Sequence, residues 1–185
     1  VSFSISDDTL KGLSTVRAQW MSPRTPQALA STTQTAVYDK VVHELGTIVC
    51  SRVRKALRDN AIPVADVAFS HVGSQHTMSD ETFAFEVTVR DTCAAEAESA
   101  LKAAIASVDA YGASSSELVM AENVYFDDMD ARQKGYERTN AAYVQMCIRT
   151  CLMDAPMSAS AQRIAYLRSK DLSSKDREQI FASIS

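Results

Sequence analysis

The clearest pattern along the chain is a stripe of apolar residues at steps of three and four, which is typical of one side of a helix. The stripe comprises Val37, Val41, Leu45, Ile48, Val49, Val53, Ala56 and Leu57. Before it, Thr25 and Pro26 fit an N-cap and a first helical position, and Pro63 ends the pattern. The spacing predicts a long helix over about residues 26–59, in which Gly46 marks a break or a close helix crossing.

Residues 64–72 and 82–90 change to a period of two, which is typical of half-buried strands. One face of the second run carries Phe83, Phe85, Val87 and Val89. The connection GSQHTMSDE is too long for a two-residue turn. Because a ribbon of two strands is marginally stable alone, we expect it to pack on helices or to pair with strands of another molecule.

Four further segments have helical patterns. Residues 7–20 place Leu10, Leu13, Val16 and Trp20 at helical steps. A stripe from Ala94 to Val108 is terminated by Gly112. The run ERTNAAYVQMCIRTCLM predicts a second core helix, and the tail after Pro156 predicts two short helices.

These elements predict a mostly helical α+β fold. We expect one long helix packed on a second core helix, a two-stranded antiparallel ribbon and a C-terminal helical hairpin. The predicted division is an N-terminal segment over 1–24 that docks on a partner, a core over 25–155 and the hairpin over 156–185.

Composition and charge narrow the class of protein. The chain has 185 residues, 46% of them hydrophobic, which suits a globular domain that folds without a metal or disulfides. Its net charge of −4 disfavours a general nucleic-acid binder, which needs a clustered positive face. No run approaches the ~18 apolar residues of a membrane span. The start at Val1 suggests a processed or trimmed N-terminus, and a targeting sequence removed from it would not be visible. An intracellular or organellar location is favoured.

The four cysteines are Cys50, Cys93, Cys147 and Cys151, too few for a disulfide scaffold. Cys147 and Cys151 are four residues apart on an apolar helical face, which favours a pair of buried thiols over a thioether tether or a redox pair. Structural zinc needs four ligands, and no second pair accompanies them, so we expect no metal site. All four cysteines remain candidates for attachment of an unassigned cofactor.

Two other groups of residues suggest chemistry but fit it poorly. His43 and Cys50 are seven residues apart, about 10 Å along a helix, which is too far for a catalytic dyad. Asp127, Asp128 and Asp130 lack the glycine and glutamate of an EF-hand, so a solvated acidic turn is favoured over a cation site.

A basic cluster of Arg52, Arg54, Lys55 and Arg58 is interpreted as a solvated helix face, with a nucleic-acid patch as the alternative. The sequence contains no G-x-G-x-x-G, no phosphate-binding G-x-x-x-x-G-K, no H-E-x-x-H and no G-x-S-x-G. These absences lead us to expect no catalytic residues and no enzyme.

Two segments resemble known families. MSASAQRIAYLRSKDLSSKDREQIF resembles the helical pair in the N-terminal domain of the peroxisomal docking peroxin. The matching residues are Arg163, Tyr166, Leu167, Lys170, Leu172 and Ser173, with Asp171 in place of that family's glycine. TFAFEVTV and YVQMC…APMSA resemble parts of red-algal phycobilisome γ and linker-type subunits, from which the acidic balance departs. The second resemblance implies bilins tethered to cysteines.

The sequence therefore predicts a non-catalytic structural subunit of a larger macromolecular assembly, with other protein subunits as partners. One alternative is a cofactor-carrying module of the bilin linker type, or a ligand-binding module. The other is a nucleic-acid-packaging protein, although nucleic acid is the less favoured partner. The identity of the partners, the oligomeric state and any modification of the cysteines are left open.

Overall fold

Two units make up the part of the chain that the computed structural model describes. The described residues are 1–8, 12–23, 29, 32–73, 80–136, 140–141, 144, 147–148, 160–170, 172–173, 175–177 and 179–180. The sheet unit takes the described residues of Val1–Arg24 and Leu45–Leu118. The helical unit takes those of Thr25–Glu44 and Val119–Ser183.

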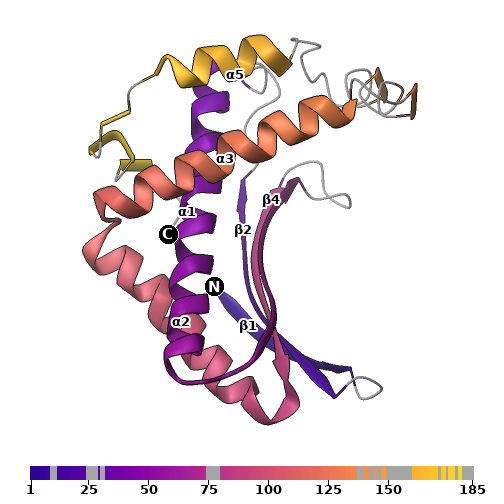
Figure 1. Cartoon of the computed structure of the whole chain (residues 1–185), viewed down its shortest axis with the longest axis vertical. Coiled ribbons are helices and arrows are strands. Elements are labelled where there is room, and N and C mark those ends of the chain that lie inside the picture. The colour runs from indigo at the N-terminus through magenta and orange to yellow at the C-terminus, as the bar shows by residue number, and fades with distance from the viewer. Residues whose placement is uncertain are drawn as a thin grey trace. The chain divides into compact units, whose positions relative to one another are not determined.

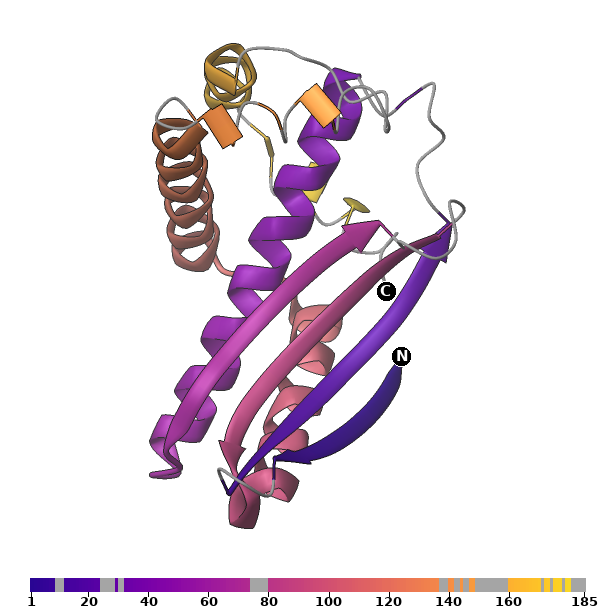
Figure 2. The same cartoon turned by 90° about the vertical axis from the view of Figure 1, so that its right-hand side faces the viewer.

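The sheet unit is built on a four-stranded antiparallel sheet. Its strands are β1 (Ser2–Asp8), β2 (Leu13–Pro23), β3 (Val64–Gly73) and β4 (Asp80–Arg90). Their order is β1-β2-β4-β3, so β1 and β3 are the edge strands (Figure 2). Since β2 and β3 are both antiparallel to β4, they run parallel to each other and the helix α1 connects them.

The two faces of the sheet differ in polarity because side chains alternate along each strand. One face carries cross-strand rows such as Val16–Val87–Val67, in which each side chain is at most 2% exposed. The other face is polar, with Thr15 Oγ1 3.2 Å from Thr88 Oγ1. In Figure 2 the sheet lies in front of α1 and α2, so the helices of this unit lie on one side of it.

The described helices are α1 (Thr33–Asp59), the 3₁₀ turn η2 (Asp91–Cys93), α2 (Ala94–Tyr111), α3 (Ser115–Tyr136) and α5 (Ser160–Arg168), of which Figure 1 labels the four α-helices. Helix α2 buries Ala97, Leu101, Ala104 and Val108, and Gly112 caps it as the sequence predicts. Helix α1 approaches β3 closely, because a Cβ built on Gly46 would lie 2.1 Å from Cδ1 of Phe69. Helix α1 is unbroken at Gly46, and the element it crosses closely there is the strand β3 rather than the helix that the sequence suggested. Among the described residues, no helix is long and apolar enough to cross a membrane.

The helical unit has an apolar cluster and a buried group of charges. The cluster comprises Tyr125, Phe126, Ile164 and Leu167. Lys40 and Glu44, both 0% exposed, place Nζ 2.7 Å from Oε1. Lys40 Nζ also donates to Glu122 Oε1 over 2.6 Å, and Arg177 Nε donates to Glu44 Oε2 over 3.2 Å. Each buried charge thus lies beside at least two opposite charges.

The expected two-stranded ribbon on a mostly helical core is wrong, because the sheet has four strands. In the segment 7–20 that was predicted as an N-terminal helix, residues 13–20 belong to β2, and Asp7 and Asp8 end β1. Val16 and Trp20 are compatible with both periods, but Ser14, Val16 and Ala18 alternate with less buried residues, and that period of two prevails.

The expected C-terminal helical hairpin is described in part, with α5 and helical residues at 175–177 and 179–180. Most of the expected second core helix lies outside the described residues. The three-segment division of the chain stays a prediction.

Candidate functional site

The site begins where α1 ends. Ala61 adopts a left-handed backbone with φ of 55°. The amide of Ile62 donates to the carbonyl of Leu57, and that of Ala61 donates to Arg58, each over 2.9 Å. These two bonds form a Schellman-type cap. The cap turns the chain through Pro63 directly into β3.

A groove of about 510 Å³ lies at this turn, within the usual size range of ligand sites. It is lined by Arg54, Arg58, Ala61, Ile62, Pro63, Val64, Ala65, Asp66 and Val67. The lining thus comes from α1, the turn and the first half of β3, and not from the neighbouring strand β4. The groove is therefore bordered by an edge strand.

An edge strand leaves alternate backbone donors and acceptors unpaired. On β3, a guanidinium N–H of Arg54 donates to the carbonyl of Val67. The register with β4 shifts between Val64 and Asp66, so Ala65 bulges beside the groove. Pro63 has no N–H, so it offers an added strand only its carbonyl acceptor. Among the described residues, no further strand pairs with the outer edge of β3.

The charged side chains at the groove are mainly basic. Arg54 and Arg58 are exposed and lie one turn apart on α1, while Asp66 is the acidic residue of the lining. Nearby, burial raises the pKa of the Cys50 thiol to about 11; the Arg54 charge lowers this pKa and the Asp66 charge raises it by smaller amounts. Cys50 therefore stays protonated near neutral pH and is a poor nucleophile.

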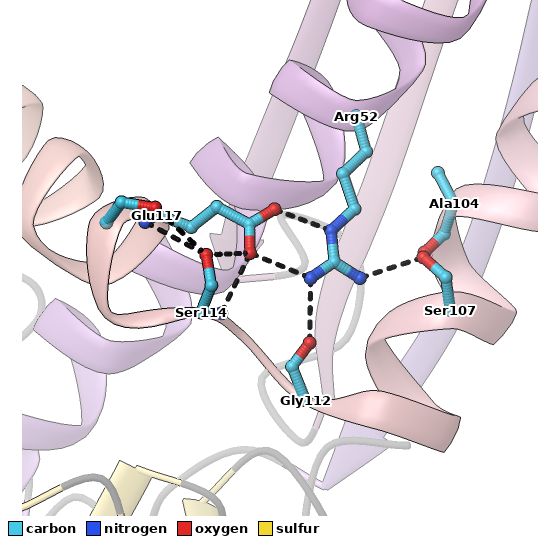
Figure 3. Close-up of polar contacts among 7 residues, drawn as sticks. Arg52, Ala104, Ser107, Gly112, Ser114 and Glu117 are labelled. Atoms are coloured by element: carbon cyan, nitrogen blue, oxygen red, sulfur yellow. Dashed lines mark hydrogen bonds and ion pairs between the residues drawn. The ribbon is translucent and has the colours of Figure 1, made fainter.

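Arg52 fixes this half of α1 to the connection between α2 and α3 (Figure 3). Its Nε and Nη2 donate to the two carboxylate oxygens of Glu117 over 2.7 and 2.9 Å. Nη1 donates to Ser107 over 2.8 Å, and Nη2 also donates to the Gly112 carbonyl over 2.7 Å. Glu117 in turn accepts from the amide and hydroxyl of Ser114, each over 2.8 Å. These contacts hold the helix that carries Arg54 and Arg58.

The Arg52 contact predicts a specific loss of stability in acid. The hydrogen bond from Arg52 lowers the pKa of Glu117 from 4.5 to about 2. The carboxylate therefore stabilises the fold above pH 4.5, and this contribution is lost as pH falls from 4.5 towards 2. At pH 7 we expect Glu117→Gln to lower the free energy of unfolding by about 1.5–3 kcal/mol. Urea unfolding measured across this range should show the two proteins converging, and a constant difference would contradict the assignment.

The candidate cysteines lie on separate elements where the structure describes them. Cys50 is buried in α1, while Cys93 in η2 and Cys147 are half-buried; all three are free thiols. Cys151 lies outside the described residues. A cofactor on any of the four stays a prediction.

The other residues singled out from the sequence make structural contacts. The His43 ring lies 5.4 Å from that of Tyr125, and burial lowers the pKa of His43. Asp128 and Asp130 belong to α3 and form ion pairs of 2.9 Å with Arg132 and Arg168. The acidic run is thus a paired helix surface in these two positions.

Of the basic cluster, the structure separates Arg52, which is bonded to Glu117, from the groove residues Arg54 and Arg58. Sequence reasoning recorded these cations but missed the groove. The available signal was two arginines at the end of a helix, followed within a few residues by a strand.

Neither a protein-family model nor a curated protein matches the sequence significantly, but solved structures match the fold. A predicted insulinase family protease from Yersinia pestis has a TM-score of 0.68 at 14% identity, with 92% of this chain and 36% of that one covered. The first half of the periplasmic protease PqqL from Escherichia coli gives 0.70 at 14%, with 93% and 36% covered. A Bordetella pertussis protein described as a candidate zinc protease gives 0.60 at 13%, with 98% and 92% covered.

These likenesses define an insulinase-like fold. The chain spans about a third of the length of the first two structures. Because the structures that share the fold are named proteases, the expectation of a non-catalytic structural subunit is wrong, and so is the expectation that the chain has no enzymatic role. The same finding counts against the two alternatives, a cofactor carrier of the bilin linker type and a nucleic-acid-packaging protein, whereas attachment of a cofactor to a cysteine stays an untested prediction.

Zinc, which one of these proteases is named for, does not fit the residues of this chain that the structure describes. The histidines are His43, His71 and His76, and no two are four residues apart, so neither H-E-x-x-H nor H-x-x-E-H occurs. Within the described ranges, no group of three or more His, Cys, Asp or Glu residues could hold a metal. His71 Nε2 instead lies 2.8 Å from Glu81 Oε2, and its ring stacks on Phe83.

Proposed function

We propose that the chain has a protease-related function, in which it binds extended segments of polypeptide along the free edge of β3. One observation carries the proposal: in a fold shared with named proteases, a groove of about 510 Å³ borders an edge strand. Proteases act on polypeptides, and an extended polypeptide is the natural partner of an unpaired strand edge.

The chemistry of the edge supports a polypeptide ligand. Backbone amides and carbonyls of β3 would pair with those of the added strand, which gives affinity for many sequences. Ile62, Pro63 and Val64 would contact its side chains, since they line the groove. One structure of the same fold is a ferredoxin protease in complex with ferredoxin, a protein ligand, at a TM-score of 0.56, 10% identity and 92% coverage of this chain against 17% of that one.

In the proposed role, residues of this chain bind the polypeptide strand and orient it. The Arg54 contact with the Val67 carbonyl fixes the first half of the edge, and the cap at Ala61 fixes the turn that forms the floor. The contacts of Arg52 hold α1 in place behind them. A bound strand would thus meet a preformed surface, which lowers the entropic cost of binding.

The proposal predicts that the purified chain binds a fluorescent, capped peptide of about ten residues, the length of a long strand. Fluorescence anisotropy should give a dissociation constant in the micromolar range. Pairing along an edge uses every second amide of the peptide. N-methylation of one alternate set of amides should therefore abolish binding, whereas N-methylation of the other set should leave it.

The matched control in this experiment is the pair of N-methylated peptides, which have the same composition. Equal effects of the two methylation patterns would exclude strand pairing. An unchanged anisotropy up to a protein concentration of about 1 mM would reject the proposed function as a whole.

A further inference from the structure

The arginines of the groove have binding capacity that their own fold does not use. A guanidinium has five N–H donors, and among the described residues the hydrogen bond recorded for Arg54 is the one to the Val67 carbonyl. Within the same part of the chain, Arg58 forms no ion pair within 4.0 Å. Two positive charges thus border the groove, against the single carboxylate of Asp66.

Arg52, on the same helix, is an example of an arginine that binds a carboxylate in this protein. Its Nε and Nη2 bind both oxygens of the Glu117 carboxylate over 2.7 and 2.9 Å. Such bidentate pairs are among the stronger hydrogen bonds in proteins, because both partners are charged and planar. Arg54 and Arg58 offer the same chemistry, but to a ligand.

We propose that the Arg54–Arg58 side of the groove selects an aspartate or glutamate side chain in the bound polypeptide. This inference rests on the proposed binding of polypeptides at β3. The apolar floor and the strand edge favour an extended peptide, and the paired arginines favour a carboxylate within it. The two arginines lie one turn apart, so a carboxylate between them would also relieve their mutual repulsion.

The position of the charges restricts where the acidic residue binds. Arg54 donates to Val67, and both arginines line the groove together with Val64–Val67. The selected side chain therefore lies over the first half of β3. A run of several acidic residues would gain less, because Asp66 would repel the second carboxylate.

The test uses the whole chain and peptides acetylated at one end and amidated at the other. They differ at one central position, which is Glu, Gln or Lys. We expect the Glu peptide to bind about tenfold more tightly than the Gln peptide, as expected for a charge-assisted contact. A fourth peptide has the central Gln and a free C-terminal carboxylate.

The matched variants remove one positive charge each from neighbouring exposed positions of α1. Arg58→Gln should abolish most of the preference for Glu over Gln, and Arg58→Lys should restore part of it. Lys55→Gln should leave the preference intact, because Lys55 is exposed on the same helix but does not line the groove. Unchanged thermal unfolding checks that each variant is folded.

The outcomes separate this inference from the proposed function. Equal affinity for the Glu and Gln peptides would overturn the inference, while the proposed function stands. An equal loss of preference in Arg58→Gln and Lys55→Gln would overturn it as well, since any nearby charge would then suffice. Tighter binding of the peptide with the free C-terminal carboxylate than of the Glu peptide would assign the groove to chain ends instead. Failure of every peptide to bind would reject the proposed function and the inference together.

Discussion

Replacing Lys40 by methionine is expected to lower the free energy of unfolding by about 3–5 kcal/mol, the usual effect of removing one partner from a buried ion pair. Lys40 and Glu44 are both 0% exposed, with Nζ 2.7 Å from Oε1. Without Lys40, the Glu44 carboxylate keeps Arg177 as a partner, with Nε at 3.2 Å. A buried charge that loses its nearest partner cannot recover its hydration. Chemical unfolding at neutral pH measures the loss.

Two variants show whether burial of the charge is the cause. Arg132→Met breaks an ion pair of 2.9 Å on α3 between side chains that are 62% and 39% exposed, so it should cost at most about 1 kcal/mol. Lys40→Met combined with Glu44→Leu should be more stable than Lys40→Met alone, because the fully buried carboxylate is then gone and the partly exposed Glu122 and Arg177 keep each other as partners at 3.6 Å. A loss below about 1 kcal/mol for Lys40→Met would contradict the buried pair.

The sequence predicted an element correctly where the local spacing of its apolar residues agrees with its packing in the folded protein. Phe83, Phe85, Val87 and Val89 alternate without ambiguity, and β4 forms as expected. Helix α1 occupies Thr33–Asp59, within the predicted range, because its apolar stripe persists over many turns. In these segments the local preference and the final packing favour the same structure.

The central strand β2 could not be predicted because its partner is distant in sequence. Leu13 pairs with Arg90 and Pro23 with Asp80. Within Leu13–Trp20, the spacing of Val16 and Trp20 fits a helix as well as a strand, so local information leaves the choice open. Pairing with β4 decides it, since β4 otherwise has an unpaired edge.

In the sequence, the groove could be recognised only as a cluster of positively charged residues. Positions 52, 54 and 58 lie on one helix, but each residue turns the side chain by about 100°, so Arg52 and Arg54 face different surroundings. Which arginine is paired depends on Glu117, which lies on another helix. The contrast between a paired Arg52 and the groove residues Arg54 and Arg58 is therefore a tertiary property.

The absence of catalytic motifs led to the wrong class of protein for a related reason. A motif reports the residues that carry out chemistry, whereas a fold also contains surfaces that hold the substrate. Structures with this fold belong to named proteases, and this chain spans 36% of the length of the first two. The groove beside β3 is built from backbone and two arginines, neither of which forms a sequence motif, and its role in binding polypeptide is the proposal made above.

Gly46→Ala is the second substitution with a large expected effect, and here the sign itself is informative. At an unhindered position inside a helix, alanine would stabilise the fold by up to about 1 kcal/mol relative to glycine. At Gly46, an added Cβ would lie 2.1 Å from Cδ1 and 2.4 Å from Cγ of Phe69. The Phe69 ring packs against Phe85 at 4.8 Å between centroids, so it cannot simply move aside. We therefore expect a net loss of about 1–3 kcal/mol from overpacking.

A double-mutant cycle with Phe69→Ala assigns this loss to the crossing of α1 over β3. Phe69→Ala removes the atoms that would clash, so in that background Gly46→Ala should become neutral or stabilising. The measurement is urea unfolding of the four proteins at one pH. A Gly46→Ala protein that is more stable than the parent would show that the helix and strand are further apart than the 2.1 Å contact requires. Since α1 and β3 together line the groove, the same result would also remove the geometric basis of the proposed binding site.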